Sequence, residues 1–154
     1  MKQLAYSFCF SWLATLAVAS ANNDWKGWYD PARDPFQDYR QAITLAQAEQ
    51  KVVLITVGGD WCGYCHDIAH FMKTNPKVNK ALNEHFVQLK VNISEENDNA
   101  EFLSHFPEFN GVPHFFVLDA SGQLLNSQPT GDFEGFFTGY SEFKFLTFLR
   151  QFTR

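Results

Sequence analysis

The sequence contains little cysteine, with only three such residues among 154, at positions 9, 62 and 65. Cys9 lies in the apolar N-terminal stretch. Cys62 and Cys65 are separated by two residues, so a disulfide between them would close too short a loop to stabilise a fold appreciably. The chain therefore lacks the cysteines from which a structural disulfide framework is built. The pair is better explained by chemistry than by structural support.

Long apolar runs are also scarce, and the single candidate lies at the start of the chain. Lys2 is followed by an uncharged, mostly apolar run from Leu4 to Val18 and then by Ala19-Ser20-Ala21. This order of a basic start, an apolar core and small residues is typical of a cleaved secretory signal peptide, predicted here over residues 1–21. We expect an exported, periplasmic product. A retained membrane anchor is the alternative, since the run approaches the length of a spanning helix.

Basic residues are fewer than acidic ones, 12 against 17, which gives a net charge of −5. This balance disfavours nucleic acid or an anionic membrane surface as a partner. The sequence also lacks a glycine-rich dinucleotide fingerprint after a strand and a Walker loop, so no nucleotide cofactor is predicted. The length fits one domain, and because no dimerisation domain is visible we expect a monomer.

The remaining chain divides into a polar, aromatic N-terminal arm over residues 22–35 and one domain over residues 36–154. Hydrophobic periodicity predicts helices over 36–50, 62–73, from Pro76 onward, 100–106 and 141–152. Strands are predicted over 51–57, 86–92, 114–119 and 123–127, the last two as a hairpin. Strands that alternate with helices and end in a hairpin indicate an α/β fold with a mixed central sheet flanked by helices.

The motif Cys62-Gly63-Tyr64-Cys65 follows a predicted buried strand and a Gly-Gly break, at the start of a predicted helix. A thiolate at a helix N-terminus is stabilised by unpaired N–H groups and the helix dipole, so the pKa of Cys62 should fall. Cys65 lies one turn further along, close enough to attack a mixed disulfide formed on Cys62. Cys62 is thus the predicted nucleophile and Cys65 the predicted resolving thiol.

The segment Trp61-Cys62-Gly63-Tyr64-Cys65 after a strand, together with Gly111-Val112-Pro113 before another, resembles the thioredoxin family. The likeness covers about residues 36–152 and is greatest to exported, single-domain bacterial members related to periplasmic thiol:disulfide interchange proteins. It implies a thioredoxin-like fold in which Pro113 is a cis-proline packed against the cysteine pair. It also implies that the Val112 backbone binds an extended substrate segment and that Lys90 lies near the buried cysteine.

One position departs from the family pattern: thioredoxins carry a buried acid six residues before the first cysteine, where this sequence has Thr56. Lys90, a water molecule or a substrate group would then have to assist the resolving thiol. His114 follows the expected cis-proline and either stabilises a thiolate or simply ends the loop before a strand. Trp61 and Tyr64 either offer an apolar surface to a substrate or support the loop.

The resemblance predicts an exported thiol–disulfide oxidoreductase with a redox-active Cys62–Cys65 disulfide and no other cofactor. Its expected partners are protein or small-molecule thiols and disulfides, and a redox partner that recharges the pair. We favour the reductase direction, with a membrane electron donor as that partner, by analogy with the family.

Three other interpretations use the same residues. Cys62-Gly-Tyr-Cys65-His66 matches the C-x-x-C-H signature of c-type haem attachment, although a haem domain needs a second axial ligand and a mostly helical pocket. Cys62, Cys65, His66 and His70 are four candidate zinc ligands, but they are crowded on one short helix, and we expect no metal. A non-enzymatic binding or chaperone module is suggested by the 17 phenylalanines, most of which lie at core spacings.

Overall fold

The computed structural model describes residues 29–137 and 139–153. Four strands form one sheet in the order β2-β1-β3-β4. β1 (Val52–Gly58) is parallel to β2 (Phe86–Asn92) and antiparallel to β3 (His114–Leu118), and β3 pairs antiparallel with β4 (Leu124–Pro129). The predicted α/β fold with a mixed central sheet is confirmed.

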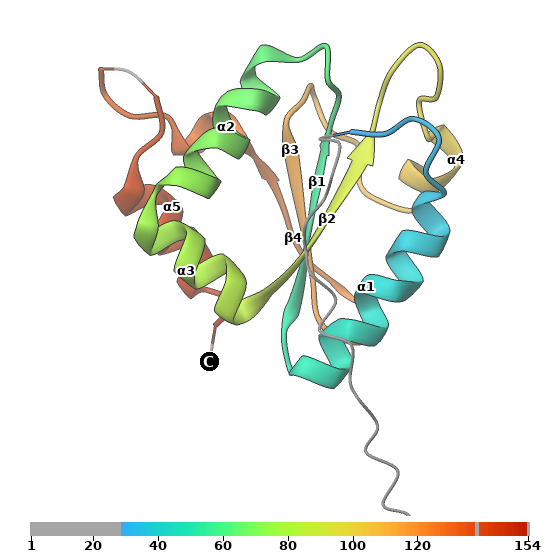
Figure 1. Cartoon of the computed structure of the whole chain (residues 1–154), viewed down its shortest axis with the longest axis horizontal. Helices are drawn as coiled ribbons and strands as arrows, with labels where there is room; N and C mark the ends of the chain where they lie inside the picture. Colours follow the sequence, from blue (N-terminus) through green and yellow to red (C-terminus); the bar gives the residue numbers. More distant parts are fainter. Residues whose placement is uncertain (1–28, 138, 154) are drawn as a thin grey trace, which may run out of the picture.

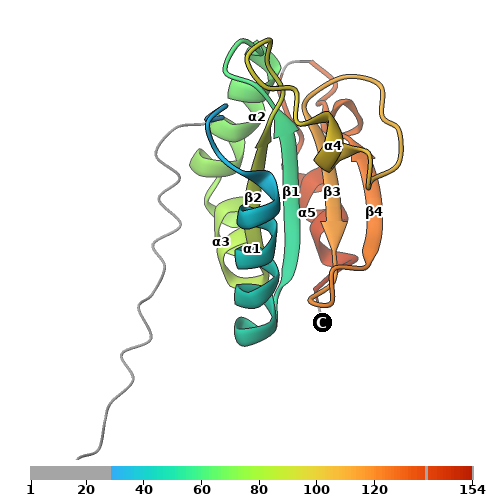
Figure 2. The same cartoon turned by 90° about the vertical axis from the view of Figure 1, so that its right-hand side faces the viewer.

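Helices cover both faces of this sheet (Figure 1). One face carries α1 (Pro35–Glu49) and α4 (Ala100–Leu103), which lie in front of the sheet in Figure 2. The other face carries α2 (Gly63–Thr74), α3 (Pro76–His85) and α5 (Glu142–Arg150), and the short 3-10 helix η1 (Thr130–Phe133) follows β4. None of the helices in the described ranges combines the length and the apolar composition needed to cross a bilayer.

The central strand β1 is buried on both faces, as its continuous apolar run predicts. Val53, Ile55 and Val57 pack into the core beneath α1 and α4, whereas Leu54 packs into the core beneath α2, α3 and α5. This alternation follows from the two-residue period of a strand. It places the C-terminal end of β1, where the cysteine motif begins, between the two cores.

Side-chain caps fix where the helices begin. Asp34 precedes α1 and accepts hydrogen bonds from the backbone N–H groups of Phe36, at 2.9 Å, and Gln37, at 3.2 Å. Asn75 caps α3 in the same way. In both helices a proline occupies the first position, where its missing N–H has no intrahelical partner in any case.

The predicted boundaries need several corrections. α1 covers Pro35–Glu49 instead of 36–50, because Pro35 takes the first helical position and Gln50 has a left-handed backbone. α2 covers Gly63–Thr74 instead of 62–73, because Cys62 is its capping residue and lies outside the helix. α4 ends at Leu103 instead of residue 106, where Ser104 Oγ donates to the Glu101 carbonyl and competes with the helical pattern. α5 covers Glu142–Arg150, shorter than the predicted 141–152.

The predicted arm is not wholly outside the domain. Residues 29–34 are described, and Tyr29 is buried with only 3% of its surface exposed. The predicted signal peptide, residues 1–21, and residues 22–28 of the arm lie outside the described residues.

Candidate active site at the cysteine pair

Cys62 and Cys65 are joined by a disulfide at the N-terminal end of α2, with their Cα atoms 5.2 Å apart. Cys62 is the N-cap residue, and the Cys65 backbone N–H points at Cys62 Sγ from 3.2 Å. Cys62 is 5% exposed, whereas Cys65 is fully buried. Of the two, only Cys62 presents any surface to an incoming thiol.

The segment that precedes β3 packs beside the cysteine pair. Cys62 Sγ lies 3.9 Å from the Val112 carbonyl oxygen, and Val112 packs against the buried cluster that contains both cysteines. The Val112–Pro113 peptide bond is cis, as the family resemblance implied. The Pro113 carbonyl accepts a hydrogen bond of 2.8 Å from Thr130 Oγ1, which ties this segment to η1. The structure thus brings Val112 and Pro113 to the cysteine pair.

Gly58, at the end of β1, is required by the close packing behind the disulfide. A Cβ atom on Gly58 would lie 2.7 Å from Cys65 Sγ and equally close to the ring and hydroxyl of Tyr29. Real Cβ atoms essentially never make contacts below 3.0 Å. The glycine therefore lets β1 pass directly beside Cys65 and Tyr29.

Tyr29 is the site residue that sequence reasoning missed. It packs with Cys62 and Cys65, although it lies more than thirty positions before them in the sequence. The available signal was an aromatic residue shortly before the Asp34-Pro35 helix start, where burial against the domain would be expected. Its polar neighbours and two nearby prolines obscured that signal.

Lys90 lies beside Tyr29, with its Nζ 5.4 Å from the centre of the tyrosine ring. Burial lowers the pKa of Lys90, while the nearby Asp60 carboxylate acts in the opposite direction. Thr56 pairs with Lys90 in the parallel register of β1 and β2 and is itself buried. Lys90 therefore reaches the neighbourhood of the pair through Tyr29, with a hydroxyl residue at the position of the family acid.

Trp61 and Tyr64 both project from the motif, with 65% and 66% of their surfaces exposed. Trp61 Nε1 donates a hydrogen bond of 2.6 Å to the Ile93 carbonyl, which fixes one edge of the indole to the loop after β2. Between the cysteines, a Cβ on Gly63 would meet nothing within 4 Å. The motif thus presents two aromatic rings and an open glycine to solvent.

His114 does not point toward the cysteine pair. Its ring stacks on Phe109 with a centroid distance of 4.9 Å, also contacts Phe116, and has Nε2 2.8 Å from Ser127 Oγ. Phe116 belongs to the core beneath α1 and α4, so His114 faces that side of the sheet. Burial lowers its pKa, which favours the neutral ring. These contacts support the structural interpretation of His114 over the thiolate-stabilising one.

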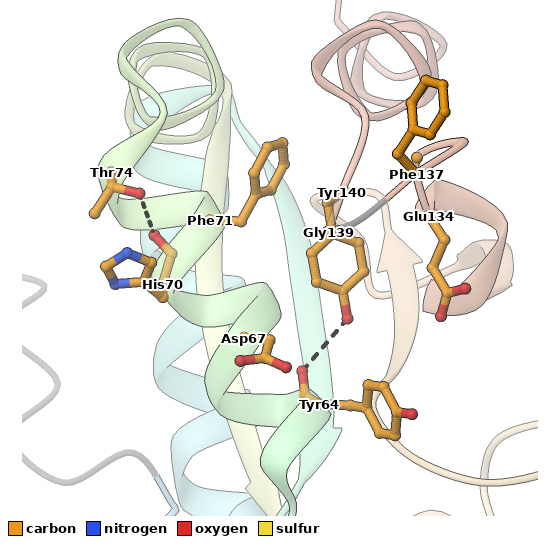
Figure 3. Close-up of a pocket in the computed structure, with 10 residues that line it drawn as sticks. Tyr64, Asp67, His70, Phe71, Thr74, Glu134, Phe137, Gly139 and Tyr140 are labelled. Carbon is orange, nitrogen blue, oxygen red and sulfur yellow. Dashed lines mark hydrogen bonds between the residues drawn. The ribbon is translucent and has the colours of Figure 1, made fainter.

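A pocket of about 630 Å³ lies beside the motif, between α2 and the segment that joins η1 to α5 (Figure 3). Tyr64 and Phe71 of α2 form one side, and Tyr140 Oη donates across to the Tyr64 carbonyl at 3.4 Å. Phe137 stands at the rim and is highly exposed. The pocket continues the aromatic surface that begins at Tyr64.

The four candidate zinc ligands do not form a ligand set in this structure. Cys62 and Cys65 are bonded to each other, and the His66 Nε2 is 2.7 Å from the Asp60 carbonyl. Within the described ranges, no three His, Cys, Asp or Glu side chains are grouped as metal ligands would be. The C-x-x-C-H motif likewise lies at the start of α2 in a domain built on a mixed sheet, not in the mostly helical pocket that the haem interpretation required.

Comparison with known proteins agrees with this geometry. The thioredoxin-like family model matches residues 34–120, which include β1, the cysteine motif and the cis-proline segment. The thiol:disulfide interchange protein DsbD of Colwellia psychrerythraea is 29% identical over 105 residues, 62% of this chain. The chain spans only 17% of the length of that relative.

Solved structures show the same fold at low identity. A disulphide isomerase from Xylella fastidiosa superimposes with a TM-score of 0.66 at 19% identity, covering 80% of this chain and 94% of that one. The oxidised DsbD C-terminal domain of Neisseria meningitidis gives a TM-score of 0.56 at 19% identity, covering 77% and 96% of the two chains. The family match, the fold and the disulfide-bonded pair agree: the chain belongs to the thioredoxin-like family.

Proposed function

We propose that the protein exchanges disulfides with protein or small-molecule thiols through a mixed disulfide on Cys62. The observation that carries this proposal is the disulfide at the start of α2 in which Cys62 alone reaches the surface. An incoming thiolate attacks the accessible sulfur, and the buried Cys65 leaves. In the reverse direction Cys65 attacks Cys62 and releases the partner.

The environment of Cys62 supports its role as the nucleophile. In the disulfide form, Cys62 Sγ lies at the N-terminus of a helix of 12 residues with the Cys65 N–H directed at it, and a Cys62 thiolate in the same place would meet both features. Both features stabilise negative charge on sulfur. The Val112 carbonyl, 3.9 Å from Cys62 Sγ, marks where the backbone of the cis-proline segment faces the reacting atom.

An extended substrate segment would lie over this end of the molecule. We assign its backbone contacts to Val112 beside Pro113, and its apolar contacts to the exposed rings of Trp61 and Tyr64. A Cβ on Gly63 would meet nothing within 4 Å, so this position of the motif leaves room for a substrate. Lys90 acts from beneath, through Tyr29.

We favour the reductase direction, with the pair recharged by a membrane electron donor and with the protein exported to the periplasm as a monomer. The support is the similarity to proteins named thiol:disulfide interchange proteins and the signal peptide predicted over residues 1–21. Equilibration of the pair with glutathione buffers tests the direction. A reduction potential of about −270 mV supports a reductant, whereas one of about −120 mV supports an oxidant.

A binding or chaperone module is the second candidate, favoured by the exposed rings of Phe136 and Phe137 beside the pocket at Tyr64. Cys62→Ser separates the two candidates. If exchange is the function, this variant loses disulfide turnover and the cellular phenotype with it. Unchanged client binding together with an unchanged phenotype would identify the binding module instead.

A further inference from the structure

The hydroxyl of Tyr29 is a buried polar group without a hydrogen-bond partner. Among residues 29–137 and 139–153, it is the one buried side-chain oxygen or nitrogen atom of this kind. Burying a hydroxyl without a partner forfeits the hydrogen bonds that it makes to water, so such a group calls for an explanation. The structure contains the pair in its disulfide form, in which neither sulfur carries charge.

The unpaired hydroxyl lies next to the buried cysteine. Cys65 Sγ and Tyr29 Oη are each 2.7 Å from the point that a Cβ on Gly58 would occupy, so the two atoms are separated by at most twice that distance. Tyr29, Cys62 and Cys65 also form one buried cluster. Because Gly58 has no side chain, no side-chain atom of this residue stands between them.

Contacts with the domain hold Tyr29 in this place. Asn97 Nδ2 donates to the Pro31 carbonyl at 2.9 Å, which ties the segment after Tyr29 to the loop following β2. Arg33 forms a two-pronged ion pair with Asp38 of α1, each bond 2.6 Å long. Lys90 Nζ lies over the face of the ring. The first two contacts anchor the segment that follows Tyr29, and the third lies against its ring.

The protonation state of the phenol suits a donor. Burial first, and then the Asp60 carboxylate, raise the pKa of Tyr29 well above its ordinary value. The hydroxyl thus keeps its proton at neutral pH. It can donate a hydrogen bond to sulfur, but it cannot act as a base.

We propose that Tyr29 Oη donates a hydrogen bond to Cys65 Sγ whenever the Cys62–Cys65 disulfide is open, and thereby stabilises the Cys65 thiolate. This role rests on the proposed disulfide exchange and makes Tyr29 a positioning residue for the resolving thiol. It supplies a polar contact to Cys65 in a chain that has Thr56 at the position of the family acid.

The exchange balances with Tyr29 unchanged. A substrate disulfide is attacked by the Cys62 thiolate, which forms a Cys62–substrate bond and releases one substrate sulfur as a thiolate. Cys65 loses its proton to that thiolate, attacks Cys62 Sγ and expels the second substrate sulfur, which takes a proton from water. Two electrons pass from the cysteine pair to the substrate, and the Tyr29 proton remains on its oxygen throughout.

Two charged side chains lie near Tyr29. Lys90 Nζ of β2 lies over the Tyr29 ring, and the carboxylate of Asp60 in the β1–α2 loop acts on both Tyr29 and Lys90. A nearby positive charge favours a thiolate and a nearby negative charge opposes it. His66 follows Cys65 in α2 and lies against the Asp60 carbonyl. A substitution at Tyr29 that leaves these three groups in place isolates the hydroxyl.

The test compares Tyr29→Phe with the unaltered chain, because phenylalanine keeps the ring and removes only the hydroxyl. The reduced protein is mixed with an aromatic disulfide whose released thiol absorbs visible light. The first phase of release reports attack by Cys62, and the second reports attack by Cys65. We expect an unchanged first phase and a second phase slowed about threefold at pH 7. Losing the hydrogen bond lowers the thiolate fraction of Cys65 about tenfold, and the higher nucleophilicity of the more basic thiolate offsets about threefold of that loss.

The pH profile separates this role from a structural one. The pH at which the rate of the second phase reaches half its maximum should rise by about one unit in Tyr29→Phe. Tyr39→Phe is the matched control, because its hydroxyl reaches the Gly122 carbonyl at the far end of the sheet. An identical second phase and pH profile in Tyr29→Phe would overturn the proposal. Absence of the first phase in the unaltered chain would instead overturn disulfide exchange itself.

The redox equilibrium gives an independent readout. Tyr29→Phe removes an unpaired hydroxyl from the oxidised form and a hydrogen bond from the reduced form, and both changes favour the disulfide. We expect the equilibrium with glutathione to shift about tenfold toward the disulfide, equivalent to a potential about 30 mV lower. A shift toward the dithiol, or none, contradicts the proposal.

Discussion

Gly58→Ala should destabilise the oxidised protein although it adds a single methyl group. That group would lie 2.7 Å from Cys65 Sγ and from two atoms of Tyr29, whereas ordinary contacts begin at 3.4 Å. Each neighbour would have to recede by about 0.7 Å. Both are buried, so neither can turn out to solvent. Overpacking of this kind costs about 1–3 kcal/mol.

Gly63→Ala provides the matched comparison, because it is the same substitution only five residues further along the chain, between the two cysteines. Nothing lies within 4 Å of the added methyl group, and Gly63 is the first residue of α2. Alanine there should be neutral or should stabilise the protein by up to about 1 kcal/mol. Urea denaturation of the two oxidised variants measures the difference in the free energy of unfolding. If Gly58→Ala proves as stable as Gly63→Ala, the packing described behind the disulfide is wrong.

Two further predictions concern the rest of the domain. Burial lowers the pKa of His114 below its ordinary 6.5, so the unfolded chain binds more protons and the free energy of unfolding falls as the pH drops below about 6.5. In denaturation measured from pH 7 to 5, His114→Gln should flatten this decline. An equally steep decline in the variant would contradict the prediction. Asp34→Ala removes the two hydrogen bonds that cap α1 and should lower the free energy of unfolding by about 1 kcal/mol. Asp34→Asn keeps a capping oxygen and should lose less stability. Equal losses in the two variants would argue against the cap.

The strands and most helices could be predicted because their signals are local. Phe86–Asn92 alternates apolar and polar residues and forms β2 over the predicted range. Pro76 begins α3, where the chemistry of Asn75-Pro76 defines the first turn without any distant contact. The boundaries that moved did so because side chains such as Ser104 compete locally for carbonyl oxygens, which hydrophobic spacing does not register.

The arrangement of the site was harder to predict because it depends on contacts between distant segments. The spacing of His114 and Phe116 puts them on one face of β3, but both faces of this sheet are covered, so the sequence does not reveal that this face is turned away from the cysteines. Tyr29 was missed because its position depends on the Asn97–Pro31 hydrogen bond across 66 positions. The cysteine motif and the cis bond before Pro113 were predictable from resemblance. The roles assigned to the supporting residues remain predictions.

The location of Tyr29 bears on how this domain can be divided or redesigned. The family model begins its match at residue 34, whereas Tyr29, which packs in the same buried cluster as the disulfide, lies before it. A recombinant fragment whose N-terminus is cut back to residue 34 would keep both cysteines and yet open the back of Cys65 to water. The segment before α1 also offers natural variation a second place at which to adjust the electron affinity of the pair, without any change between Cys62 and Cys65.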